Sequence, residues 1–145
     1  MNQNQKNRIA IVMLSGFFLF LDQLCKYLAL RQWKNTYSLT NFLGWHPFAN
    51  YGAAFGLVLP RSLIIILSCL ILLTIFYLIF KQKNKFNIFS AWILVATGAL
   101  SNLFDRAFRG FVVDYFYLIT GYINLADILI VVGLLIFLQA SRKRH

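Results

Sequence analysis

Four long runs of apolar residues organise this sequence, and polar residues interrupt them at only a few positions. The runs cover residues 9–30, 63–80, 86–104 and 123–141. Each is close to the roughly 20 helical residues that cross about 30 Å of hydrocarbon. An open sheet would leave backbone groups unpaired in lipid, so all four runs are predicted to be membrane-spanning helices.

The composition agrees with a membrane protein. Of the 145 residues, 60% are hydrophobic, and glutamate is absent. Such a chain is too apolar for a soluble domain and too short for two domains, so residues 1–145 are expected to form one membrane-embedded domain. The predicted fold class is an all-α integral membrane protein with four transmembrane helices and a small extracytoplasmic β-sheet.

The basic residues predict the orientation, because lysine and arginine near short loops stay in the cytoplasm. With both termini cytoplasmic, that side holds Lys6, Arg8, Lys81, Lys83, Lys85, Arg142, Lys143 and Arg144. The outer side then holds fewer, namely Arg31, Lys34, Arg61, Arg106 and Arg109. The net charge of +10 therefore indicates topology and contact with anionic lipid, and no nucleic-acid partner is expected.

The segment 31–62 between the first two runs is rich in aromatic residues, which favour the membrane interface. Short alternating pieces at 36–39 and 45–48, broken by turn residues, predict a small sheet on the outer membrane surface. We interpret this segment as a lid or cradle for a substrate that arrives from the membrane.

All the acidic residues are aspartates, and each lies in or against an apolar run. A carboxylate near hydrocarbon is costly, so it is normally kept only when it is paired, faces a polar cavity or takes part in chemistry. Asp22 and Lys26 are four residues apart on one helical face and are predicted to neutralise each other. Asp105 and Arg106 fall at the end of the third run, where a local ion pair or a snorkelling arginine is expected.

Asp114 and Asp127 have no basic neighbour on the same helical face and are therefore the reactive candidates. Asp114 is expected in the loop before the last helix, and Asp127 about one turn into that helix. With a rise of about 1.5 Å per residue, the polar residues fall at a similar depth near the outer leaflet. The predicted pocket is lined by Asp22, Lys26, Asn50, Asn102, Arg106, Asp114, Asn124 and Asp127.

Two carboxylates that meet in a low dielectric would share one proton, which is the arrangement of an aspartic protease. From these residues alone, a proton or ion relay or a transporter using the same aspartates stays open, as does a catalytically silent scaffold. A zinc protease of the His-Glu-x-x-His type is excluded, because the chain has no glutamate and its only histidines are His46 and His145. Cys25 and Cys69 lack metal-site spacing, so no metal or cofactor is expected.

Five blocks, in order along the chain, resemble the lipoprotein signal peptidase family, also called signal peptidase II. They are Asp22–Lys26, Asn50–Gly56, Gly98–Arg106, Val112–Asp114 and Asn124–Asp127. The resemblance implies an aspartic endopeptidase of the bacterial inner membrane that cuts prolipoproteins just before a cysteine carrying diacylglycerol. Its partners would be lipid-modified prolipoproteins and membrane lipids, and it would act as a monomer.

The resemblance also implies roles for individual residues. Asp114 and Asp127 fall on the family's catalytic pair, and Asp22 and Lys26 on a polar pair that supports the site. The positions that line the family's substrate pocket are matched by Asn50, Asn102, Arg106 and Asn124.

Four positions depart from the family pattern. Cys25 stands where threonine is typical, Thr97 and Ser101 where glycines are typical, and Ile123 where phenylalanine is typical. Ser101 adds a side chain where its lack would allow close helix approach, so pocket width or substrate preference is expected to differ. A divergent paralogue with a specialised substrate set is one interpretation.

Overall fold

The computed structural model describes residues 1–52, 59–81, 86–119 and 121–142. It contains helices α1 (Gln3–Arg31), α2 (Arg61–Lys81), α3 (Phe86–Phe108) and α4 (Leu125–Arg142). All four are long and apolar enough to cross a membrane, as the sequence predicts. Phe55 of the expected cradle and four of the expected cytoplasmic cations, Lys83, Lys85, Lys143 and Arg144, lie outside the described residues.

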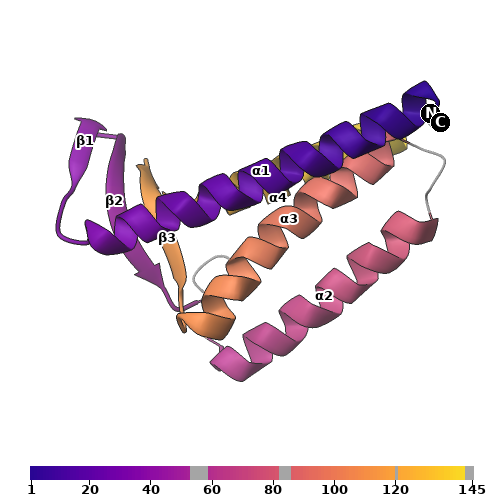
Figure 1. The fold of residues 1–145 in the computed structure, drawn as a ribbon. Coiled ribbons are helices and arrows are strands. Elements are labelled where there is room, and N and C mark those ends of the chain that lie inside the picture. The colour runs from indigo at the N-terminus through magenta and orange to yellow at the C-terminus, as the bar shows by residue number, and fades with distance from the viewer. Residues whose placement is uncertain (53–58, 82–85, 120, 143–145) are drawn as a thin grey trace.

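Helix α3 is the centre of the bundle and packs against each of the other three helices (Figure 1). Glycines allow α3 and α4 to approach closely. A Cβ on Gly98 of α3 would lie 2.3 Å from the carbonyl oxygen of Ala126, and one on Gly133 of α4 would lie 2.7 Å from that of Ala91. Small residues at a helix interface bring backbones together in lipid, where apolar burial alone gives no driving force.

The strands form one antiparallel sheet in the order β1-β2-β3-β4. Strands β1 (Tyr37–Thr40) and β2 (Leu43–Asn50) confirm the pieces predicted between the first two helices. Strands β3 (Val112–Leu118) and β4 (Gly121–Ile123) lie just before α4. The sheet sits at one end of the bundle, and both chain termini lie at the other end (Figure 1).

The prediction of a loop around Asp114 is wrong, because Asp114 lies within β3 and pairs with Phe48 of β2. The first four residues of β3 are all buried, so the strand lacks the polar and apolar alternation that identifies a half-exposed strand. A strand buried on both faces gives only a short apolar run, which is ambiguous in sequence.

Helix α3 extends one turn beyond its predicted end and therefore carries Asp105 and Arg106 on helical backbone. It ends before Gly110, whose φ of +89° suits a residue without a side chain. The Arg61 side chain donates to the carbonyl oxygens of Arg106 and Ala107, both at 2.9 Å. These bonds satisfy carbonyl groups that have no partner within the helix.

Candidate active site

Asn124 and Asp127 form a reciprocal cap at the start of α4. The backbone N–H of Asp127 donates to Oδ1 of Asn124 at 2.9 Å, and the N–H of Asn124 donates to Oδ2 of Asp127 at 3.3 Å. This is the geometry of a capping box, with a shorter acid in place of the usual glutamate. The Asn-Leu-Ala-Asp block is therefore a helix start as well as a candidate functional motif.

Asn124 also contacts the other candidate carboxylate. Its Nδ2 lies 2.6 Å from Oδ1 of Asp114 on β3, and the Asn124 side chain is fully buried. Asp114 and Asp127, thirteen positions apart in the printed sequence, thus share one hydrogen-bonding partner. The strand and the helix bring the two acids to the same residue.

Two further amides hold the remaining oxygens of the pair. Asn50 of β2 donates to Oδ2 of Asp114 at 3.0 Å, and Asn102 of α3 donates to Oδ1 of Asp127 at 2.8 Å. Among the described residues, neither Asp114 nor Asp127 forms an ion pair. Neutral donors orient a carboxylate without cancelling its charge, so both groups stay available for proton exchange.

Asp114 lies outside the predicted spans but is only 1% exposed. Burial raises the pKa of its carboxyl from 3.8 to about 6, opposed by the hydrogen bond from Asn50 and reinforced by the charge of Asp127. A carboxyl with a pKa near neutrality can both take up and release a proton under physiological conditions. Half-buried Asp127 lies beside it on the first turn of α4.

Arg106 is one of the cations near this pair, together with Lys26. Its guanidinium donates to the carbonyl oxygen of Gly52 at 3.4 Å, and the charges of Asp127 and Asp114 both act on it. The predicted ion pair between Arg106 and Asp105 is wrong: Asp105 pairs with Arg109 and with Lys26. Residues four apart share a helix face, whereas adjacent residues point in different directions.

Lys26 is the centre of a fully buried cluster behind the candidate pair. Its Nζ lies 2.9 Å from Oδ2 of Asp22, 3.1 Å from Oδ2 of Asp105 and 2.9 Å from Oδ1 of Asn102. The predicted ion pair of Asp22 with Lys26 is confirmed. Asp105 forms a second ion pair with the same lysine. Asp22 and Lys26 are wholly inaccessible, so they support the site from inside rather than line an open pocket.

Two hydroxyls in this cluster were not predicted from the sequence. Ser101 donates to Oδ2 of Asp22 at 2.5 Å, and Tyr115 donates to Oδ1 of the same carboxylate at 2.8 Å. Ser101 is fully buried, so it bonds within the cluster and does not narrow an accessible pocket. No sequence signal marked Tyr115, because it lies in a strand buried without alternation; only its burial in the structure shows that its hydroxyl needs a partner.

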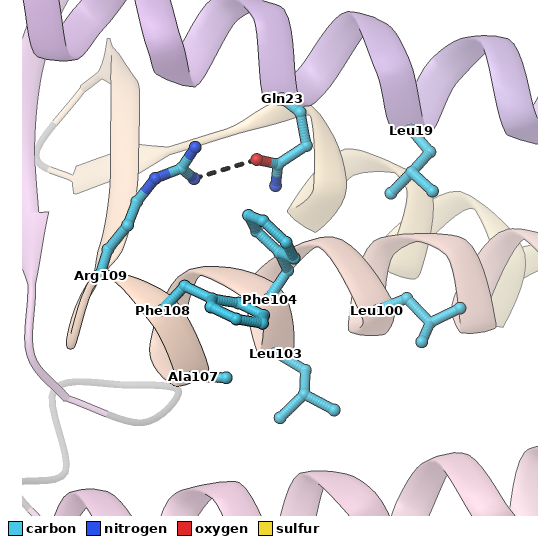
Figure 2. A pocket seen from close by; sticks show the side chains of 8 residues that line it. All are labelled: Leu19, Gln23, Leu100, Leu103, Phe104, Ala107, Phe108 and Arg109. Carbon is cyan, nitrogen blue, oxygen red and sulfur yellow. Dashed lines mark hydrogen bonds between the residues drawn. The ribbon is translucent and has the colours of Figure 1, made fainter.

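A separate apolar groove of about 700 Å³ lies along α1 and α3 (Figure 2). It is lined by Leu19, Gln23, Leu100, Leu103, Phe104, Ala107, Phe108 and Arg109. At its polar end, Arg109 donates to Oε1 of Gln23 at 3.0 Å. Neither candidate catalytic residue is among these lining residues, so the groove is not where the carboxylates would act.

Sequence comparisons relate this chain to known proteins. The family described as signal peptidase (SPase) II matches residues 14–142. A lipoprotein signal peptidase from Serratia marcescens is 34% identical, over 91% of this chain and 84% of the relative. One from Clostridioides difficile is 38% identical, over 86% of each chain.

A solved structure described as a bacterial membrane enzyme is similar in fold. It is 25% identical, covers 92% of this chain and 88% of its own, and has a TM-score of 0.83. The four-helix bundle with its small sheet is therefore the fold of a known membrane enzyme.

Proposed function

This chain belongs to the signal peptidase II family, membrane aspartic proteases that remove the signal peptide from lipoprotein precursors, and we propose that Asp114 and Asp127 are its catalytic pair. The observation that carries the proposal is their common contact with Asn124. The relay and transporter alternatives use the same aspartates, but the family assignment favours proteolysis.

The proposed reaction is the addition of water to the peptide carbonyl beside the lipid-bearing cysteine. One carboxylate takes a proton from the attacking water, while the other, in its protonated form, donates its proton to the carbonyl oxygen, which gives a gem-diol intermediate. The first acid then passes the proton it took from water to the leaving amine, and the second takes a proton back from a hydroxyl of the gem-diol as the carbonyl re-forms. The two acids share a single proton in the working state, because like charges in a low dielectric do not both ionise readily. Asp114 and Asp127 exchange roles as the proton moves.

The surrounding residues would hold the pair and the substrate. Asn50 and Asn124 orient Asp114, and Asn102 orients Asp127. Arg106 is half-buried and lies in the field of both acids, so we assign it to the carbonyl groups of the bound peptide. A fixed constellation of this kind reduces the reorganisation needed during reaction.

We further propose that the enzyme lies in the bacterial inner membrane with both termini in the cytoplasm. The described basic residues at the terminal end of the bundle include Lys6, Arg8, Lys81 and Arg142, and positive residues favour the cytoplasm. The sheet is at the opposite end (Figure 1), which would put it on the outer membrane surface as a cradle. The candidate pair would then act near the outer leaflet, on lipid-modified prolipoproteins, as a monomer.

Isosteric removal of each charge tests the catalytic pair. We expect Asp114→Asn and Asp127→Asn each to lower the rate of cleavage of a purified diacylglyceryl-modified prolipoprotein by about a thousandfold, because an amide neither accepts nor donates the required proton. Membrane insertion and binding of the substrate should persist. Asn41→Asp, at an exposed turn, is the control for an asparagine and aspartate exchange elsewhere.

Full cleavage by either purified variant would remove the assignment of the pair. Substrate binding without cleavage by the unaltered protein would instead point to the silent scaffold. The two outcomes are distinguished by measuring binding and product formation on the same preparations.

A further inference from the structure

Tyr115 directly follows Asp114 on β3, and its side chain is fully buried. Successive strand residues point to opposite faces, so Tyr115 points away from its catalytic neighbour. Its hydroxyl donates to Oδ1 of Asp22 at 2.8 Å and accepts the backbone N–H of Leu125 at 3.0 Å. Leu125 is the first residue of α4, two positions before Asp127.

Asp22 accepts a hydrogen bond from Ala126, the next residue in the first turn of α4. Its Oδ1 accepts the backbone N–H of Ala126 at 3.2 Å, while its Oδ2 is bonded to Ser101 and Lys26. The first N–H groups of a helix have no partner inside the helix. Here the first two are satisfied by Tyr115 and Asp22, and the third is satisfied by the capping Asn124.

Strand β3, which carries Asp114, is hydrogen-bonded to the same buried cluster. Oδ2 of Asp105 accepts the backbone N–H of Val113 at 3.0 Å, and Val113 immediately precedes Asp114. Lys26 lies between Asp105 and Asp22 and bonds to both. Tyr115 is the side chain that joins this strand directly to the backbone of the helix carrying Asp127.

We propose that Tyr115 is a positioning residue, whose hydroxyl fixes the start of α4 against β3 and thereby sets the separation of Asp114 and Asp127. The inference rests on the proposed catalytic pair. The ring itself packs with Ala29, Val113 and Trp45, and phenylalanine could retain that packing. Burial raises the pKa of the Tyr115 phenol above its usual value, so its hydroxyl stays a donor to Asp22 at working pH.

Tyr115→Phe in the full-length purified enzyme removes the hydroxyl and keeps the ring. A small displacement of catalytic groups slows the chemical step, so kcat should fall about tenfold. Tyr115 faces away from the substrate, so KM should stay within about twofold of the wild-type value. Tyr77→Phe is the control for loss of a tyrosine hydroxyl elsewhere. Tyr77 lies on α2, outside the sheet and the proposed site, and its side chain is exposed.

A second comparison removes the same hydrogen bond from its other end. Leu125→Pro deletes the N–H at the first helical position, where proline is well tolerated, and Leu125→Ala removes the leucine side chain but keeps the N–H. We expect kcat of the proline variant to be about tenfold below that of the alanine variant, matching the effect of Tyr115→Phe. This pair does not depend on how Tyr115→Phe folds.

Wild-type kcat in Tyr115→Phe, or equal kcat in the two Leu125 variants, would overturn the proposal. A purely structural role would instead lower the amount of folded enzyme with kcat per active molecule unchanged, so active molecules are counted by titration with a tight-binding inhibitor. If Asp114→Asn and Asp127→Asn are inactive while Tyr115→Phe is fully active, the catalytic assignment stands and only the positioning role fails.

Discussion

Nδ2 of Asn102 lies 2.8 Å from Oδ1 of Asp127, and the same side chain accepts from Nζ of Lys26 at 2.9 Å through its own oxygen. Lysine has only donors, so its contact turns the Asn102 oxygen inward and leaves the amide hydrogens facing Asp127. The buried cluster thus determines how one carboxylate of the proposed catalytic pair is held.

Asn102→Ala should therefore lower kcat by about tenfold to a hundredfold, because Asp127 loses the donor that orients it. The assay is cleavage of a lipid-modified prolipoprotein under saturating substrate. Leu100→Ala, at an exposed position in the apolar groove along α1 and α3, is the control and should retain activity. Wild-type kcat in Asn102→Ala would show that this hydrogen bond has no role in turnover.

The pKa of Asp114, raised to about 6, predicts an acid limb in the pH profile. Above that pH Asp114 can ionise and the pair keeps a base; below it a second proton occupies the pair and the base is lost. We expect kcat/KM to fall by about tenfold per pH unit below about pH 6, with the apparent pKa belonging to the coupled pair.

Asn50→Ala should move that limb to higher pH. The Asn50 amide donates to Oδ2 of Asp114 and so favours its ionised form, and its loss raises the pKa of Asp114 further. The full pH profile of kcat/KM is the measurement, with Asn41→Ala at the exposed turn as the control. A limb that stays in place or moves to lower pH would contradict the assignment of Asp114 to this limb.

Gly98 tests the close contact that brings α3 to α4. A Cβ at Gly98 would lie 2.3 Å from the carbonyl oxygen of Ala126, the residue before Asp127, so Gly98→Ala should push the helices apart. Overpacking of this kind costs about 1–3 kcal/mol, and activity should fall because Asn102 on α3 moves away from Asp127. Thermal unfolding in detergent and cleavage are measured together.

Gly16→Ala is the matched control for that substitution, since nothing lies within 4 Å of a Cβ at Gly16 of α1. Alanine is the better helix former by about 1 kcal/mol, so this variant should be as stable as the wild type or more stable. Equal behaviour of the two alanine variants would mean that the α3–α4 contact tolerates a methyl group.

The four helices were predictable because a run of about 20 apolar residues is by itself long enough to cross a membrane. Each observed helix contains all or most of the corresponding predicted run. The Asp22 and Lys26 pair was predictable for a similar reason, since residues four apart on a helix meet without knowledge of the tertiary fold. Spacing along the sequence is enough to predict contacts within one helix.

Contacts between distant elements were less accessible from the sequence. From local sequence, Asp105 was expected to pair with Arg106 unless that arginine snorkels, whereas its partners in the structure include Lys26 of another helix. Strand β3 was missed because its first residues are buried without alternation. Tyr115 gave no recognisable motif, because its partners are a side chain on α1 and a backbone N–H on α4. Such partners are fixed only when the elements have packed.

Lys26 should matter more for stability than for chemistry. It is fully buried and is the shared cation of Asp22 and Asp105, so Lys26→Met leaves Asp22 without a cation among the described residues and Asp105 with Arg109 alone. Loss of one partner of a buried ion pair costs about 3–5 kcal/mol, because the remaining charge is left in a low dielectric. We expect a large drop in the thermal unfolding temperature in detergent, whereas Lys81→Met, at the exposed end of α2, should unfold like the wild type. A normally stable Lys26→Met enzyme would mean that the two acids are held by their hydroxyl and amide donors without the lysine.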